Sequence, residues 1–134
     1  MTDRETTKTL VSQAYEVRNK GDLEALIGFF HPDASFTIAG ENRLTTAAAT
    51  VRGHNALRQA LGGLISAFEF IQRDIVNLVV DGDRCACHSR ARVRFVPKDR
   101  VATTDILDLF KFDNGKIVEF IEFADTALIN DLTR

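Results

Sequence analysis

The sequence predicts an α+β fold, in which three N-terminal helices pack on a curved, mainly antiparallel sheet. Two observations lead to this prediction. Apolar residues recur at helical spacing in the first half of the chain, whereas the second half reads as strands separated by turns. The clearest turn is Asp113-Asn114-Gly115, which lies between two apolar-rich runs. Helices followed by an antiparallel meander are typical of helices packed on one face of a sheet.

The helical half begins with a helix over residues 4–19. Its apolar positions at helical spacing are Leu10, Val11, Ala14, Tyr15 and Val17 or Arg18. Gly21 can end this helix, and Asp22 can cap a second helix whose buried stripe is Leu23, Leu26, Ile27 and Phe30. His31-Pro32-Asp33 stops that helix, because the residue before a proline disfavours the helical conformation. A third helix is expected over residues 53–68.

The strands follow a different period. A short strand is expected over residues 35–38, and residues 40–50 are small and polar, as in a loop or lid. Further strands are expected near 70–80, 84–96, 101–112 and 116–124, with a short helix over 125–132. We expect Asp125 to cap this helix. Because no linker or repeat interrupts the pattern, residues 1–134 are predicted to form one domain.

Composition excludes several classes of function. Seventeen basic and nineteen acidic residues give a formal net charge of −2, which predicts no nucleic-acid partner and no anionic membrane partner. The start of the chain has no signal-peptide pattern, and no run approaches the ~20 apolar residues of a membrane helix. Cys85 and Cys87 lie two apart, a spacing that suits small reduced core residues rather than zinc or redox chemistry. We therefore expect a cytoplasmic protein.

Carboxylates at spacing three mark the last predicted strand. Glu119, Glu122 and Asp125 cannot all lie on one face, because strand side chains alternate with period two. At least one of them should point toward the interior, where a carboxylate needs a partner or a chemical role. Ten Phe against one Tyr and no Trp suggest a core or pocket with few polar groups on its rings.

The order of several short motifs resembles the SnoaL-like superfamily, which includes ketosteroid isomerases and polyketide cyclases. These motifs are Gly21-Asp22-Leu23, Phe30-His31-Pro32-Asp33-Ala34, Arg52-Gly53-His54 and Asn114-Gly115-Lys116-Ile117. The resemblance covers nearly the whole chain. It implies a cone of helices and bent sheet around an apolar cavity, and it implies a homodimer. The superfamily also contains proteins without chemistry, so its fold does not supply a function.

The ketosteroid isomerase pattern is only partly present. The position of its general base falls at Ile38, and its tyrosine donor falls at Ala14, one position from Tyr15. Its second oxyanion donor, a protonated aspartate, matches Asp105. Asp105 could instead be an outward acid paired with an arginine of the neighbouring strand. Without the base, the resemblance does not imply a true ketosteroid isomerase.

The polyketide-cyclase pattern implies a different catalytic residue. Its acid–base residue falls at Glu122, although Phe120-Ile121 replaces the His-Trp that precedes it in the family. A carboxyl group among apolar side chains can be tuned by desolvation to exchange protons near neutral pH. The alternative is a solvated acid in a cross-strand ion pair. We expect the residues lining the ligand cavity to include Ile38, Leu57, Leu61, Phe120 and Ala124.

Together these features predict an enzyme of the isomerase, cyclase or dehydratase type, acting on a small, mostly apolar carbonyl-bearing or cyclic molecule. Glu122 would be the acid–base residue, while Asp105 and Tyr15 would polarise an oxygen. No cofactor or metal is implied. The alternatives are a non-catalytic ligand-binding or dimerisation module, and a partner-docking protein of the transport-factor type. An open cavity that contains an acid would favour the enzyme or the ligand-binding module. A closed cone with an exposed apolar patch would favour the partner-docking protein.

A row of basic residues alternates along the predicted strand 84–96. It consists of His88, Arg90, Arg92 and Arg94, and the opposite row is small and apolar. The apolar row should face the helices, so we expect the arginines on the outer sheet face, near Asp108 or Glu119, in solvent or in a homodimer interface. A one-residue change of register would instead turn the arginines into the cavity as an anion site.

Overall fold

The structure, a computed structural model, describes residues 3–40 and 50–134. The elements in chain order are α1 (Arg4–Asn19), α2 (Leu23–Ile27), β1 (Phe30–Ile38), β2 (Thr50–Arg52), α3 (His54–Ala67), β3 (Phe68–Asp81), β4 (Arg84–Phe95), a 3-10 turn η2 (Val96–Lys98), β5 (Arg100–Asp113), β6 (Lys116–Ala124) and α4 (Thr126–Thr133). The strands form one six-stranded sheet in the order β2-β1-β6-β5-β4-β3.

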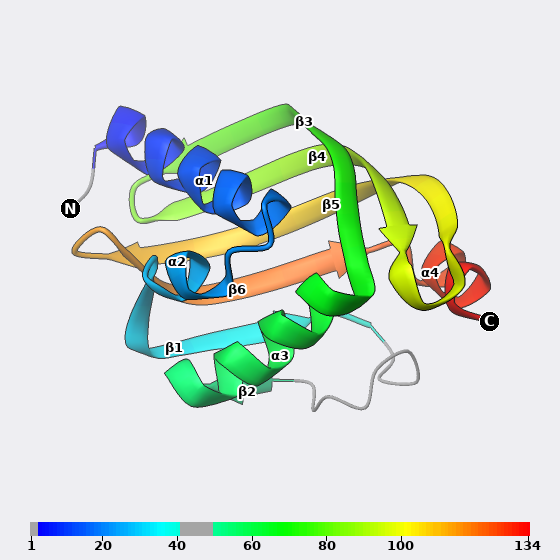
Figure 1. The fold of residues 1–134 in the computed structure, drawn as a ribbon. Coiled ribbons are helices and arrows are strands. Elements are labelled where there is room, and N and C mark those ends of the chain that lie inside the picture. The colour runs from blue at the N-terminus through cyan, green and yellow to red at the C-terminus, as the bar shows by residue number, and fades with distance from the viewer. Residues whose placement is uncertain (1–2, 41–49) are drawn as a thin grey trace.

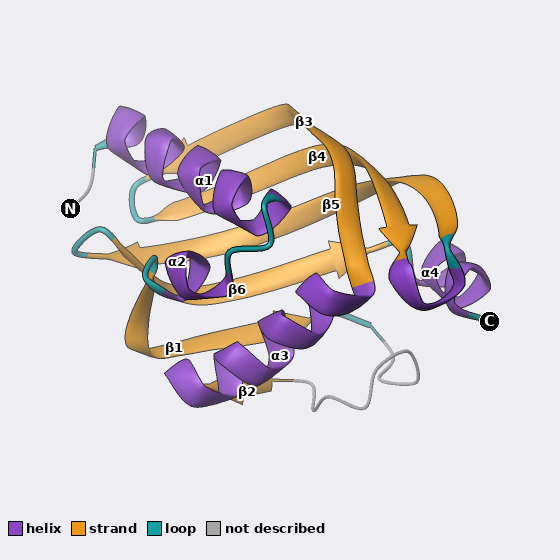
Figure 2. Ribbon diagram, viewed as in Figure 1, coloured by secondary structure: helices purple, strands orange, loops and turns teal. Residues whose placement is uncertain are grey.

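The helices and the sheet form two layers. Helices α1, α2 and α3 lie on one face of the sheet, and β3 curves strongly as it leaves α3 (Figure 1). Strands β3 to β6 form an antiparallel meander, and β6 continues the sheet through a parallel pairing with β1. Helix α4 lies at the end of the sheet where the β4–β5 connection also lies (Figure 2). The predicted α+β architecture with a curved, mainly antiparallel sheet is confirmed.

Local sequence signals account for several boundaries. Helix α1 covers the predicted span, and the side chain of Asp3 caps it by accepting a hydrogen bond from the amide of Thr6 at 3.0 Å. Asn114 and Gly115 both have positive φ, 50° and 76°, as a two-residue hairpin turn requires. Asp125 caps α4 by accepting from the amide of Leu128 at 3.1 Å, as predicted.

The start of the sheet differs from the prediction. Strand β1 begins at Phe30 rather than at residue 35, so Phe30 and Pro32 belong to this strand and not to the end of the second helix. Pairing with β6 extends the chain here, and the amide of Ile117 donates to the carbonyl of Phe29 at 2.9 Å. The predicted loop or lid over 40–50 lies, apart from its two ends, outside the described residues, and β2 was not predicted.

The core fills the space between the two layers. It is built from apolar side chains of α1, α2, α3 and the inner sheet face, and Phe110, Phe120 and Phe36 stack in series with centroid separations of 4.7 and 4.9 Å. Cys85 and Cys87 are buried free thiols on the inner face of β4. None of the described helices is both long and apolar enough to cross a membrane.

The basic row of β4 lies on the outer face of the sheet, as expected. Cys87, Ser89 and Ala91 are buried, whereas the alternating residues Arg90 and Arg92 are exposed. The partner of Arg90 differs from the expectation. Strand pairing sets Arg90 opposite Asp105, and their side chains form an ion pair at 2.9 Å, with neither Asp108 nor Glu119 involved.

Candidate active site

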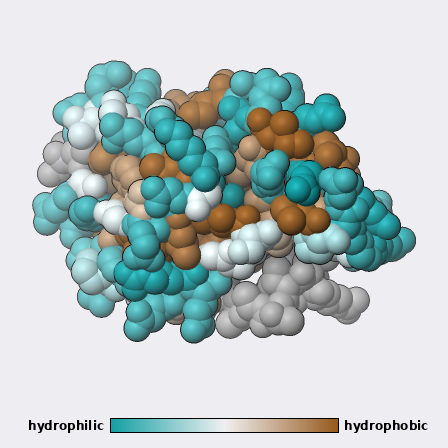
Figure 3. Space-filling view, viewed as in Figure 1, coloured by the Kyte–Doolittle hydropathy of each residue, from teal (hydrophilic) through white to brown (hydrophobic). Residues whose placement is uncertain are grey.

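A cavity of about 120 Å³ lies between the inner face of the sheet and the helices α1, α3 and α4. Its wall is mostly apolar and contains Phe30, Phe68, Phe70, Phe110 and Phe120. Seen from the helix side, apolar surface appears in the middle of the molecule between hydrophilic margins (Figure 3). The charged side chains in the wall are Arg18, Arg73 and Glu122.

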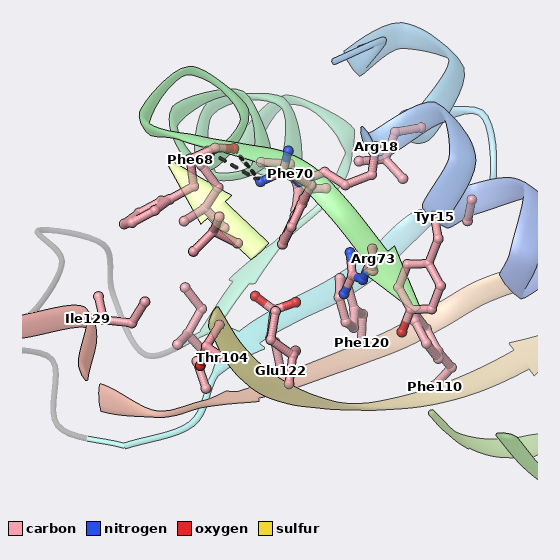
Figure 4. A pocket seen from close by; sticks show the side chains of 18 of the residues that line it. Tyr15, Arg18, Phe68, Phe70, Arg73, Thr104, Phe110, Phe120, Glu122 and Ile129 are labelled. Atoms are coloured by element: carbon pink, nitrogen blue, oxygen red, sulfur yellow. Dashed lines mark hydrogen bonds between the residues drawn. The ribbon is translucent and has the colours of Figure 1, made fainter. Parts of the chain in front are cut away.

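Most of the residues predicted from the sequence line this cavity. Glu122 points from β6 toward Phe70 and Arg73, and Tyr15 lies beside Arg73 (Figure 4). Four of the five residues expected to line it do so, namely Ile38, Leu61, Phe120 and Ala124. Ile38 pairs with Glu122 in the parallel register of β1 and β6, so an aliphatic side chain stands next to the cavity acid.

Two predicted residues lie elsewhere. Asp105 is not a cavity donor, because it sits on the outer face of β5 with its side chain half exposed. There it accepts from Arg90 and interacts with His88 at 3.2 Å, and these hydrogen bonds hold its pKa below the usual value. Leu57 does not line the cavity either. It is fully buried in the core, one helical turn before Leu61 on α3.

The interior aspartate of β5 is Asp108, which the sequence argument placed on the wrong face. Its side chain is fully buried, and strand pairing sets it directly opposite Glu122 on β6. Its Oδ2 accepts a hydrogen bond from the Tyr15 hydroxyl at 2.6 Å and one from Nη2 of Arg73 at 3.3 Å. Its Oδ1 is buried, and no described residue donates a hydrogen bond to it.

Burial controls the protonation of this aspartate. Desolvation raises the pKa of Asp108 well above the usual aspartate range, the negative charge of Glu122 raises it further, and Arg73 opposes the shift. A protonated Asp108 can donate from Oδ1 to the Glu122 carboxylate, which gives the otherwise unpartnered oxygen a hydrogen bond. Asp108 and Glu122 are therefore neighbouring carboxyl groups, and burial together with the second acid raises the pKa of Asp108.

Arg73 contacts Asp108, the more deeply buried of these two acids. Its side chain is 3% exposed, its Nε donates to Ser89 Oγ at 3.2 Å, and its guanidinium lies 4.0 Å above the Tyr15 ring. The other neighbour is Phe70, whose ring centroid is 4.4 Å from the guanidinium carbon. Burial also raises the pKa of Tyr15, so its hydroxyl keeps its proton and donates it to Asp108.

Arg18 is the second guanidinium of the cavity and comes from the turn of α1 that follows Tyr15. Its Nη2 donates to the carbonyls of Phe68 at 3.1 Å and Leu64 at 3.4 Å, at the C-terminal end of α3. It lies 4.4 Å from the centroid of Phe70. Burial lowers the pKa of Arg18 to about 10, so it remains charged at neutral pH.

The sequence contained a signal for Asp108 but not for Arg73. The small apolar row of β4 was expected to face the helices, and opposite residues of paired strands share a face, so Cys87 and its partner Asp108 must both point inward. Arg73 was missed because β3 has register shifts between Phe70 and Gln72 and again between Ile75 and Asn77, and each shift breaks the alternation.

The arrangement suits proton transfer. An acid borders an apolar cavity, a buried acid with a raised pKa stands behind it, and two guanidinium groups can stabilise negative charge that develops on a bound molecule. Among residues 3–40 and 50–134, no group of three or more His, Cys, Asp or Glu side chains is placed to hold a metal ion.

Comparison with known proteins gives one family and many similar folds. A family model described as a SnoaL-like domain matches residues 11–120. An NTF2-like protein of unknown function from Burkholderia pseudomallei has a TM-score of 0.81 at 22% identity, and each chain is covered to 98%. An NTF2-like protein from Burkholderia xenovorans has a TM-score of 0.77 at 23% identity, with both chains covered to 100%.

A third similar structure is SalBIII, described as an epoxide hydrolase/cyclase-like enzyme with a role in pyran ring formation in the polyether salinomycin. Its TM-score is 0.77 at 20% identity, over 95% of this chain and 96% of that one. At such identities the likeness concerns the fold. No sequence of a curated protein matches the chain significantly.

Proposed function

This chain belongs to the SnoaL-like domain family, and we propose that it is a cofactor-independent acid–base enzyme acting on a small, mostly apolar molecule that bears an oxygen. The observation that carries this proposal is the pair formed by Asp108 and Glu122, which stand opposite each other on β5 and β6. Glu122 borders the cavity, and Asp108 lies behind it with a raised pKa. Such a pair of unequal acids is a common basis for proton transfer.

In the proposed reaction, Glu122 is the catalytic residue. Its carboxylate takes a proton from the carbon next to a carbonyl group, and the electron pair of the broken C–H bond forms an enolate. Arg18 and Arg73 favour the negative charge that develops on the enolate oxygen. Glu122 then returns the proton to a carbon of the same molecule, which completes an isomerisation. Tyr15 and Asp108 are positioning residues, because the hydroxyl proton of Tyr15 is already donated to Asp108.

Proton exchange at carbon tests this proposal without knowledge of the natural substrate. Cyclohexanone in D2O is the probe, and deuterium incorporation is followed by proton NMR. We expect the wild-type protein to accelerate exchange over buffer, and we expect Glu122→Gln to reduce the catalysed rate by about 10²–10⁴-fold. Glu119→Gln is the matched control, since Glu119 lies on the same strand opposite Lys111 and does not line the cavity.

Two results would count against the enzyme. Exchange that is no faster than in buffer would favour the non-catalytic ligand-binding module, and exchange that survives Glu122→Gln would remove Glu122 from the reaction. Binding of cyclohexanone, measured by chemical-shift changes of cavity residues, separates these cases. A module that only binds would show the shifts without deuterium incorporation.

The outer sheet face supports a second proposal, a homodimer. Leu107 and Phe123 are cross-strand partners on β5 and β6, and both are exposed. The Arg90–Asp105 ion pair also lies on the outer face of β4 and β5, so this face combines apolar surface with both signs of charge. Such a surface suits contact with a second copy of itself.

Sedimentation velocity at micromolar concentration tests the dimer. We expect the wild type to sediment as a dimer and Phe123→Arg to sediment as a monomer. Gln13→Arg introduces the same charge on the exposed side of α1, away from the sheet, and should leave the dimer intact. A monomeric wild type would rule out the interface.

A further inference from the structure

We propose that the cavity takes a monoanionic ring compound whose carboxylate is bound by Arg18, an inference about substrate class that rests on the proposed acid–base function of the same site. Three independent features of the described residues lead to it. They are the absence of a described ion-pair partner for Arg18, the hydrogen-bonding state of the two arginines, and the size of the cavity.

The two cations of the cavity differ in their counterions. Arg18 and Arg73 flank the same ring, that of Phe70. Arg73 forms an ion pair with Asp108 at 3.3 Å, whereas Arg18 donates only to backbone carbonyls and forms no ion pair with a described residue. A buried charge without a counterion is unfavourable, so the site is completed by a ligand that brings one negative charge.

Arg18 is the arginine that can receive this ligand. Arg73 is already enclosed, since it donates to Ser89 and Asp108 and lies between the rings of Tyr15 and Phe70. Arg18 uses only Nη2, which donates to two carbonyls at the end of α3, and no described residue accepts from its Nε or Nη1. These contacts fix the plane of the guanidinium while leaving Nη1 and Nε as donors for a charge-assisted contact with a carboxylate.

The size of the cavity restricts the rest of the molecule. Its volume of about 120 Å³ is below that of an apolar protein cavity that holds benzene, about 150 Å³, so it has room for no more than one ring. The wall is rich in phenylalanine, which favours a flat apolar ring by edge and face contacts. The volume therefore limits the ligand to a single ring, the wall suits an aromatic ring, and Arg18 suits a carboxylate on that ring.

A purely structural role of Arg18 makes a different prediction. Its bonds to the carbonyls of Leu64 and Phe68 also satisfy the C-terminal end of α3, where a cation is favourable. If that were its whole role, replacing it would change stability but not the preference between a charged and a neutral ligand of the same shape. The test therefore uses benzoate and benzamide, which differ little in shape and differ by one charge.

Titration calorimetry at pH 7 measures both affinities. We expect wild type to bind benzoate about tenfold or more tightly than benzamide, because charge-assisted hydrogen bonds are the stronger kind. Arg18→Gln should abolish this ratio and Arg18→Lys should keep part of it. Arg90→Gln, on the outer sheet face, should keep all of it. Glu122→Gln should tighten benzoate and leave benzamide unchanged, because it removes the negative charge of the cavity.

Each contrary result overturns the inference. These are equal affinity of wild type for the two ligands, no binding of either at millimolar concentration, or a benzoate preference that survives Arg18→Gln. If Arg18→Gln does not fold, the Glu122→Gln result decides, and unchanged benzoate affinity in that variant is a rejection. The proposed reaction is judged separately by deuterium exchange into cyclohexanone, which is neutral. Failure of the benzoate test therefore does not affect the conclusion from deuterium exchange, and failure of the exchange test does not affect the conclusion from benzoate binding.

Discussion

Replacing Asp108 with alanine should lower the free energy of unfolding by about 3–5 kcal/mol, the range for breaking a buried charged network by removing one partner. The substitution leaves the Tyr15 hydroxyl without its acceptor at 2.6 Å and the guanidinium of Arg73 without its carboxyl partner. Both groups are buried, so water does not replace the lost contacts without rearrangement. Urea unfolding followed by circular dichroism measures the change.

Asp105→Ala is the matched control for this experiment. Asp105 lies three residues earlier on the same strand and forms its own ion pair with Arg90, but on the exposed face. Solvent screens such a pair, so its removal should leave the denaturation midpoint nearly unchanged. Equal losses for the two variants would mean that β5 does not present Asp108 to the interior.

Replacing Asp108 with asparagine should produce a pH-dependent gain relative to wild type. Asparagine has nearly the shape of a protonated aspartate, its carbonyl can accept from Tyr15 and Arg73, and its amide can donate toward Glu122. Because the pKa of Asp108 is raised in the folded state, the folded chain binds more protons than the unfolded chain above about pH 4. Wild type therefore loses stability as pH rises, and the asparagine variant lacks this loss.

The sign and the size of this stability difference both follow from the single proton that Asp108 can bind. Below the usual aspartate pKa the carboxyl is neutral in both states, so the difference between the variants is constant there. Above it, the difference should grow in favour of Asp108→Asn by at most about 1.4 kcal/mol per pH unit, until the folded carboxyl ionises. Both variants keep the other titratable or charged groups around Asp108, which are Tyr15, Arg18, Arg73, Cys85, Cys87 and Glu122.

Thermal unfolding of both proteins between pH 4 and pH 8 tests this prediction. A difference that stays constant over the range would mean that Asp108 does not exchange a proton on folding. A difference that turns in favour of wild type as pH rises would mean that Asp108 is ionised in the folded protein and held by Arg73.

Strand alternation allowed much of this molecule to be predicted. The turn at Asn114-Gly115 and the apolar pattern after it led to β6, and the spacing of acids on that strand led to an inward Glu122. Helical spacing brought Tyr15 and Arg18 to the same stripe of α1. These inferences succeeded because each depends only on regular geometry within one element.

The errors arose where pairing between elements decides the outcome. Asp105 was chosen from a family pattern, although the alternation of β4 and the pairing of β4 with β5 require the inward residues of β5 to include Asp108. Arg73 follows a register shift in β3 between Phe70 and Gln72, and no pattern in the sequence indicates this shift. Strand β1 begins as early as Phe30 because it pairs in parallel with β6, which lies far along the chain. The helix-stop signal alone could not indicate this pairing.

The bond from Tyr15 to Asp108 also has a consequence for biosynthesis, because the two residues are separated by 93 positions. A ribosome adds about 5–20 residues per second, so α1 emerges roughly 5–20 s before the strand that it must contact. During that interval the helix is only 16 residues long and marginal by itself. The α1 helix must therefore avoid non-native contacts until β5 emerges, and the site is completed only after β5 and β6 have been synthesised.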